Sequence, residues 1–106
     1  ERRYLLQSPM PKLVLIAKGK ARTIEMGQEL TIGRGYSNLL RLEGEEISRV
    51  HAIIYRRDDD FIVRDLDSKN GVYVNGSRTA FAQLDRGDRL QVGNYRMIFD
   101  PPSDFD

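Results

Sequence analysis

The sequence predicts an all-β fold, namely a two-sheet β-sandwich of about nine to eleven mostly antiparallel strands with binding loops at one end. Short apolar runs are separated by Gly, Asn, Asp or Ser at the roughly 8- to 12-residue spacing that is typical of sandwiches and barrels. No window shows an apolar stripe of helical period and helical length. The 106 residues suit a single domain with one core.

Nine runs carry the strand prediction, and each is bounded by turn-forming residues. In chain order they are residues 12–17, 22–26, 29–32, 39–42, 51–55, 61–65, 72–74, 89–92 and 95–99.

Alternation of apolar and polar residues is clearest in the last of these runs. Tyr95, Met97 and Phe99 share one side of the predicted strand, and residues 22–26 alternate in the same way. We therefore expect each of these two strands to have one buried, apolar face.

Four short segments predict the turns between strands. Asn75-Gly76 and Gly93-Asn94 tolerate the positive φ angles of two-residue hairpins. Residues 85–88, Asp-Arg-Gly-Asp, predict a further turn, and residues 58–60, Asp-Asp-Asp, predict a charged loop tip.

The charge balance excludes a bulk electrostatic attraction to nucleic acid or to an anionic membrane. Seventeen Lys and Arg residues face sixteen Asp and Glu residues, which leaves a net charge of +1. The chain has no cysteine and one histidine, so we expect no disulfide, no metal site and no cofactor. Any anion site must be built locally.

The domain is expected to occupy residues 12–100, with tails or linkers at residues 1–11 and 101–106. The longest apolar stretch, residues 13–17, is far shorter than a membrane span, and the charged start does not lead into a signal peptide. We therefore expect a cytoplasmic, intracellular domain. Because the sequence begins with Glu1, we also expect it to be part of a larger protein.

Three loop segments hold small and polar residues between predicted strands, at residues 33–38, 45–51 and 67–71. The loops of a sandwich gather at its ends, where binding sites are commonly built. These three segments are therefore the candidate site.

Four short motifs in these segments resemble the forkhead-associated (FHA) domain, a β-sandwich module that binds phosphothreonine in peptides. They are Gly33-Arg34, Ser48-Arg49-Val50-His51, Ser68-Lys69-Asn70-Gly71 and Asn75-Gly76, in the order of the family, and residues 84–93 are also similar to it. The resemblance covers about residues 13–99. It implies a non-catalytic interaction module of Ser/Thr kinase signalling whose partner is a phosphothreonine-containing protein or peptide.

Phosphothreonine carries about −1.5 to −2 charges and three acceptor oxygens, so its site needs a cation with directed donors and further N–H or O–H groups. Arg34 can supply the paired donors of a guanidinium. The resemblance implies that the Ser48 hydroxyl donates to the phosphate, and Arg49 can donate or add positive potential.

Asn70 is the residue that we expect to bind the peptide backbone, because its amide both donates and accepts. Lys69 departs from the small hydroxyl residue that many family members carry, so the preference for phosphothreonine over phosphoserine is left open. The resemblance makes His51 a buried support of the loops. We expect Gly33, Gly71, Asn75 and Gly76 to support the site through their backbone conformations.

Three alternatives remain open at this point. The chain is a scaffold of the same fold that binds partners without phosphate, a small hydrolase that uses Ser48 and His51, or a nucleic-acid-binding domain with a basic patch seeded by Arg56-Arg57. The hydrolase lacks a recognisable nucleophile elbow, and the near-zero net charge disfavours nucleic acid.

Overall fold

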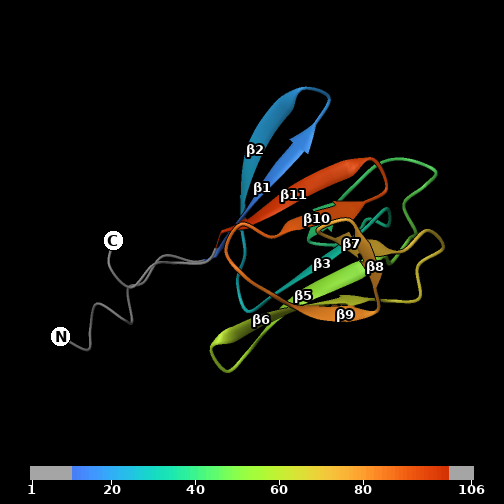
Figure 1. Ribbon diagram of the computed structural model, residues 1–106. Helices are drawn as coiled ribbons and strands as arrows, with labels where there is room; N and C mark the ends of the chain where they lie inside the picture. The colour runs from blue at the N-terminus through green and yellow to red at the C-terminus, as the bar shows by residue number, and fades with distance from the viewer. Residues whose placement is uncertain (1–10, 101–106) are drawn as a thin grey trace.

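Eleven strands form two packed sheets and confirm the predicted all-β sandwich (Figure 1). The computed structural model describes residues 11–100. The strands are β1 (Lys12–Ala17), β2 (Lys20–Glu25), β3 (Glu29–Gly33), β4 (Leu40–Arg41), β5 (Ala52–Arg57), β6 (Asp60–Asp65), β7 (Val72–Val74), β8 (Ser77–Thr79), β9 (Phe81–Leu84), β10 (Arg89–Val92) and β11 (Tyr95–Asp100).

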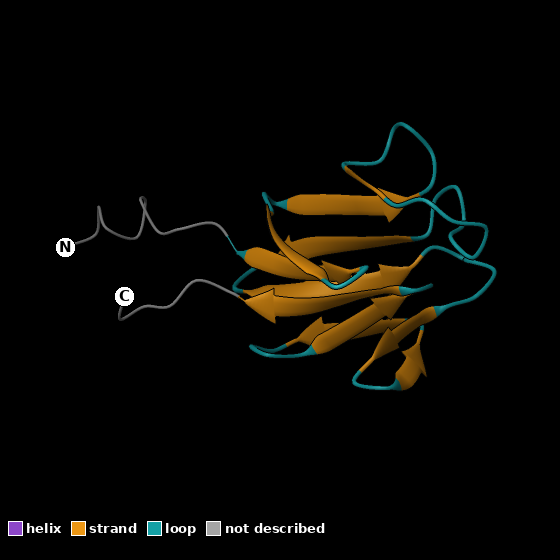
Figure 2. Cartoon of the chain, turned by 90° about the horizontal axis from the view of Figure 1, so that it is seen from above, coloured by secondary structure: helices purple, strands orange, loops and turns teal. Residues whose placement is uncertain are grey.

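The first sheet has six strands in the order β2-β1-β11-β10-β7-β8, and the second has five in the order β4-β3-β5-β6-β9. Strand β4 pairs with β3 in parallel, whereas the other strand pairs are antiparallel. The longer loops gather at the end of the sandwich opposite to Lys12 and Asp100, which pair with each other in β1 and β11 (Figure 2).

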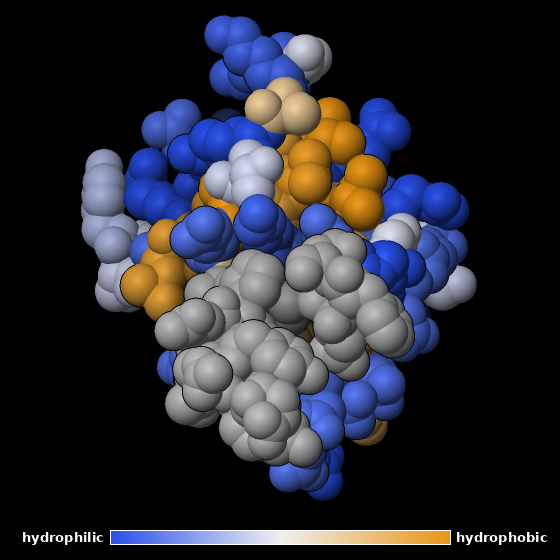
Figure 3. Space-filling model, turned by 90° about the vertical axis from the view of Figure 1, so that its left-hand side faces the viewer, coloured by the Kyte–Doolittle hydropathy of each residue, from blue (hydrophilic) through white to orange (hydrophobic). Residues whose placement is uncertain are grey.

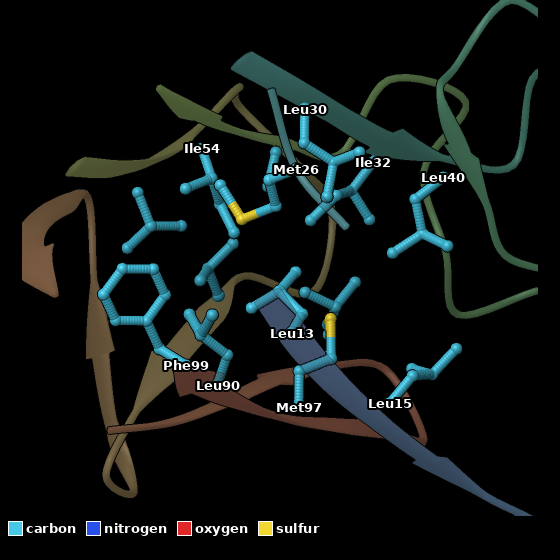
Figure 4. Close-up of a cluster of buried hydrophobic side chains, with 14 of the residues drawn as sticks. Leu13, Leu15, Met26, Leu30, Ile32, Leu40, Ile54, Leu90, Met97 and Phe99 are labelled. Atoms are coloured by element: carbon cyan, nitrogen blue, oxygen red, sulfur yellow. The ribbon is translucent and has the colours of Figure 1, made fainter. Parts of the chain in front are cut away.

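The core lies between the sheets, and side chains from both layers point toward one another (Figure 4). Leu13 of β1 and Met97 and Phe99 of β11 are fully buried from one side, and Ile32 of β3 and Ile54 of β5 are fully buried from the other. Their alternate positions along each strand place them on the same face. The alternation predicted for residues 95–99 is therefore confirmed.

Each of the nine predicted runs coincides with a strand, but two strands were not predicted. Strand β8 reads Ser-Arg-Thr and has no buried residue, and β9 begins with Phe81, which is 61% exposed. Both lie at the edges of their sheets. An edge strand with little buried surface has no apolar alternation to reveal it.

The expectation for residues 22–26 was partly wrong. Most of β2 is exposed, and within it only Ile24 is half-buried against the core, while Met26 is buried just beyond the strand. The β1–β2 hairpin projects from the body of the sandwich (Figure 1), so its edge strand has no opposing sheet along most of its length.

All four predicted turns are present. Asn75 and Gly76 have φ angles of 51° and 87°, and Gly93 has a φ of 59°, as two-residue hairpins require. Asp58 stands at the β5–β6 turn with a φ of 57°, and Gly87 has a φ of 85° in the turn before β10. These angles explain the Gly and Asn at the hairpin positions.

The predicted tails at residues 1–11 and 101–106 lie outside the described residues, except for Pro11. Pro11 is buried, and its carbonyl accepts a hydrogen bond of 2.9 Å from the Met26 amide. Within residues 11–100, no helix has the length and apolar character needed to cross a membrane. In the view of Figure 3, hydrophilic residues surround a smaller hydrophobic group.

A shortened side chain at Met97, which has no exposed surface, tests the packing of the core. Met97→Ala should lower the free energy of unfolding by about 2–5 kcal/mol, because it removes buried methylenes and leaves a cavity. Chemical denaturation measures this loss. Ile16→Ala, at a partly exposed position of β1, is the control and should cost less than about 1 kcal/mol. Equal losses would contradict the packing described here.

Candidate functional site

Four hydrogen bonds bring the three candidate loops together at one end of the sandwich. The Arg34 and Gly35 amides donate to the carbonyls of Ser48 and Arg49, both at 3.0 Å. The Lys69 amide donates to Ser48 Oγ at 2.9 Å, and Asn70 Nδ2 donates to the Glu46 carbonyl at 2.9 Å. Segments that are up to 36 residues apart in sequence thus share one rim.

Arg34 follows the last residue of β3, and its backbone and side chain are both held by the second loop. Its Nε donates to the Ile47 carbonyl at 3.1 Å, and its own carbonyl accepts from Arg41 Nε at 2.8 Å. The two terminal nitrogens of its guanidinium make no hydrogen bond within the described residues. This side chain is therefore anchored at Ile47, the residue before Ser48, and its two terminal nitrogens can bind an anion.

Gly33 and Gly35 allow close packing of two loops, and the special backbone conformation that we expected at Gly33 is not present. Neither has a positive φ. A methyl group at Gly33 would lie 2.3 Å from the Arg49 carbonyl oxygen, and one at Gly35 would lie 2.9 Å from Arg49 Cγ. The absent side chains let the first loop lie directly against the second.

Asn38 also connects the same two loops, a role that the sequence did not predict. Its Nδ2 donates to the carbonyls of Gly35 and Arg49, both at 2.8 Å. An Asn in a polar loop is common for turn chemistry alone, so nothing in the sequence marks this longer connection.

His51 is fully buried and joins the second loop to the third loop and to strand β3. Its Nδ1 accepts from the Ser48 amide at 3.0 Å, and its Nε2 lies 2.8 Å from the Gly71 carbonyl. Because Nδ1 accepts, Nε2 carries the proton and donates to Gly71. The His51 amide also donates to the Ile32 carbonyl of β3 at 2.8 Å.

These bonds leave no catalytic pair of Ser48 and His51. Both ring nitrogens of His51 bind backbone groups, and the hydroxyl of Ser48 accepts from the Lys69 amide. A general base must instead reach the hydroxyl of its nucleophile. The hydrolase alternative is wrong in this respect, whereas the Ser48 hydroxyl keeps its own proton to donate outward.

The third loop is shaped by its own serine. Ser68 is buried, its Oγ accepts from the Gly71 amide at 2.9 Å, and its amide donates to Asp65 Oδ1 at 3.2 Å. Gly71 has a φ of 88°, which a residue with a side chain rarely adopts. This turn exposes the two side chains between Ser68 and Gly71, which are those of Lys69 and Asn70.

Asn75 and Gly76 lie away from the loops, at the other end of β7. Asn75 Oδ1 accepts from the Arg89 amide at 2.9 Å, and its Nδ2 donates to Asp88 Oδ1 at 3.0 Å. They make no direct contact with Arg34 or Ser48 among the hydrogen bonds of residues 11–100. Their hairpin instead returns β8 beside β7.

The rim carries unpaired positive charge. Arg34, Arg49 and Lys69 are exposed and form no ion pair within residues 11–100. Arg41, in contrast, pairs with Glu43 at 3.4 Å and lies over the ring of Tyr36. Cations that are not paired with carboxylates are suited to bind an anion of local, high charge.

Exposed apolar side chains accompany these cations. Of the five large hydrophobic residues that are exposed within residues 11–100, Tyr36 and Val50 belong to the rim, and Leu39 directly follows its first loop. Tyr36 is 88% exposed. Apolar side chains beside a charged site are typical of a surface that binds another protein.

Two other site chemistries find no support in the described part of the chain. No group of three or more His, Cys, Asp or Glu side chains there could hold a metal ion. Arg56, proposed as the seed of a nucleic-acid patch with Arg57, donates to the Asp58 carbonyl and pairs with Asp59 at 3.6 Å. Its charge is therefore balanced within the β5–β6 turn.

Comparison with known proteins points to one family. The FHA domain family model matches residues 30–93. The oxoglutarate dehydrogenase inhibitor of Corynebacterium diphtheriae is 38% identical over 69 residues, which are 65% of this chain and 48% of that protein. The chain spans about half the length of the curated relatives that it matches first.

Two solved structures share the fold at 31% sequence identity. One comes from a structural and functional analysis of phosphothreonine-dependent FHA domain interactions, with a TM-score of 0.78 over 85% of this chain and 94% of that chain. The other is the FhaA FHA domain in complex with the intracellular domain of Rv3910, with a TM-score of 0.77 over 84% of this chain and 98% of that chain.

The buried imidazole predicts a specific loss of stability. His51→Ala leaves the Ser48 amide and the Gly71 carbonyl without their partner, so it should lower the free energy of unfolding by about 2–4 kcal/mol. The exposed neighbour Val50 is the control, and Val50→Ala should change it by less than about 0.5 kcal/mol. Chemical denaturation compares the two variants, and an equal effect would contradict the support role of His51.

Proposed function

Because the chain belongs to the FHA domain family, we propose that it is a phosphothreonine-dependent interaction module that binds phosphorylated segments of partner proteins. The family model covers more than half of the chain. The proposed site is the rim formed by the three loops, with Arg34 and Ser48 on the phosphate.

The observation that carries this proposal is that the backbone and side chain of Arg34 are held against the loop of Ser48. Two bonds of 3.0 and 3.1 Å hold the backbone and Nε of Arg34 against Ser48 and Ile47. The guanidinium can offer its terminal nitrogens, and the hydroxyl can offer its proton, to the oxygens of one phosphate group. Arg34 forms no ion pair within residues 11–100 that would have to be broken before phosphate binds.

The other predicted residues fit supporting roles in the proposed site. Arg49 and Lys69 add exposed positive charge beside the phosphate position. Asn70 donates one amide proton to Glu46, which leaves its second proton and its carbonyl oxygen for the backbone of a bound peptide. Gly33, His51 and Gly71 hold these side chains in place.

The expected affinity is that of a reversible signalling contact. Each charge-assisted hydrogen bond contributes roughly 1.5–3 kcal/mol, and ordering of the peptide offsets part of the sum. A dissociation constant on the order of micromolar follows. We further propose that residues 12–100 act without catalysis as an intracellular recognition unit within a regulatory protein. The name of the Corynebacterium relative, an inhibitor, is consistent with regulation by binding.

Removal of the guanidinium tests the phosphate site. Arg34→Ala should weaken binding of a phosphothreonine peptide by about a hundredfold or more in calorimetry, because two charge-assisted hydrogen bonds are lost. Arg57→Ala, at the opposite end of β5, is the matched control and should leave the affinity unchanged. Thermal melting should show both variants folded, and full binding by folded Arg34→Ala would remove this site from consideration.

A peptide series separates the proposal from the phosphate-independent scaffold. Of the phosphothreonine, phosphoserine and unmodified versions of one peptide, the unmodified version should bind at least about a hundredfold more weakly than the phosphothreonine version, and the phosphoserine version measures the selectivity that Lys69 leaves open. Binding that is unchanged by phosphatase treatment of the peptide would favour the scaffold. Nothing in the described residues favours that alternative over the proposal.

A further inference from the structure

A fourth cation, Arg78, lies next to the proposed site, beside Gly71. Arg78 of β8 lies across the backbone of Gly71, where an added methyl group would come within 2.5 Å of Nε, 2.9 Å of Cζ and 3.1 Å of Cδ. Gly71 directly follows Asn70, the residue proposed to hold the peptide backbone. The Arg78 guanidinium therefore lies directly beside the proposed phosphopeptide site.

Arg78 has no carboxylate to balance it. Its side chain is exposed, and it forms no ion pair or side-chain hydrogen bond within residues 11–100. The strand β8 contributes nothing to the core, so packing gives no reason for a long cationic side chain on Gly71. A neighbouring glycine without a side chain gives the arginine a flat backbone surface on which to lie.

The positive charge continues along the outer face of the six-stranded sheet. Tyr73 pairs with Arg78 across β7 and β8, Gln91 pairs with Tyr73, and Arg96 pairs with Gln91. Directly opposed residues of antiparallel strands have side chains on the same face, about 5 Å apart at Cβ. These four residues therefore form a row with two guanidiniums, one phenol and one amide, and no carboxylate.

Acidic residues also lie near Asn70. Its amide is bonded to the Glu46 carbonyl, and Glu43 and Glu45 are exposed in the same loop. The Glu46 carboxylate is bonded to Asn94 at the β10–β11 turn. Acidic residues of this loop and basic residues of the row thus both lie within reach of a peptide held by Asn70, so the charges of the peptide itself decide which of them it contacts.

We propose that Arg78, with Tyr73 and Arg96, binds acidic side chains of the phosphopeptide on one side of its phosphothreonine. This inference rests on the proposed function and adds the class of sequence that the module prefers, which is a phosphothreonine next to Asp or Glu residues. The guanidinium of Arg78 and the phenol of Tyr73 supply the donors for a carboxylate.

The test uses three phosphothreonine peptides that differ only in their flanks: glutamates after the phosphothreonine, glutamates before it, or glutamines in all of these positions. One of the two acidic peptides should bind about three- to fivefold more tightly than the glutamine peptide, as expected for an exposed ion pair. Rising salt should reduce this advantage, since exposed charges are screened.

Variants of Arg78 assign the advantage to its charge. Arg78→Gln keeps most of the side chain on Gly71 and should remove the advantage while binding of the glutamine peptide stays within twofold. Arg78→Lys should keep most of it. Arg57→Gln, with the same loss of charge at a distant position, should keep all of it.

Three results would overturn the inference. The acidic advantage could be absent, it could persist in Arg78→Gln, or an unphosphorylated acidic peptide could bind as tightly as its phosphorylated form, which would make the row an independent docking surface. If the glutamine phosphopeptide also fails to bind, the proposed function itself is wrong and the inference falls with it. Binding of that peptide thus separates the two failures.

Discussion

The imidazole of His51 is the interaction on which the binding rim depends. The ring is buried completely, and its two nitrogens bond the amide of Ser48 and the carbonyl of Gly71. The backbone amide of His51 donates to the Ile32 carbonyl of β3, just before Gly33. The side chain thereby fixes the second loop against the third, and the backbone amide of the same residue ties both to β3. A buried polar network of this kind specifies geometry because each group left unpaired would be costly.

The side chains that we propose for recognition can be exposed because the loops that carry them are held by bonds inside the protein. Arg34, Lys69 and Asn70 reach outward from backbones that are already bonded to neighbouring loops. Little ordering of the loops is then required on binding, which lowers the entropic cost of association. The sandwich supplies the rigid frame, and the loops supply the chemistry.

The sequence was sufficient for the strands with an apolar face, such as β11, and for hairpins marked by Asn75-Gly76 and Gly93. It was insufficient for β8, because Ser-Arg-Thr is polar throughout and lies at a sheet edge. The motifs identified Arg34, Ser48 and Asn70 as neighbours, but Asn38 and Arg78 act through contacts between distant segments that no local pattern reports. The reason for Gly33 was also out of reach, since close approach of Arg49 is a tertiary fact.

The pairing of β1 with β11 has a consequence for the architecture around the domain. Lys12 and Asp100 are direct partners in the register, and the rim lies at the far end of the sandwich. Because the two ends of the domain adjoin each other, the domain can be inserted into a surface loop of another protein without separating the two ends of that loop. Flexible connectors joined there would leave the ligand-facing end unobstructed.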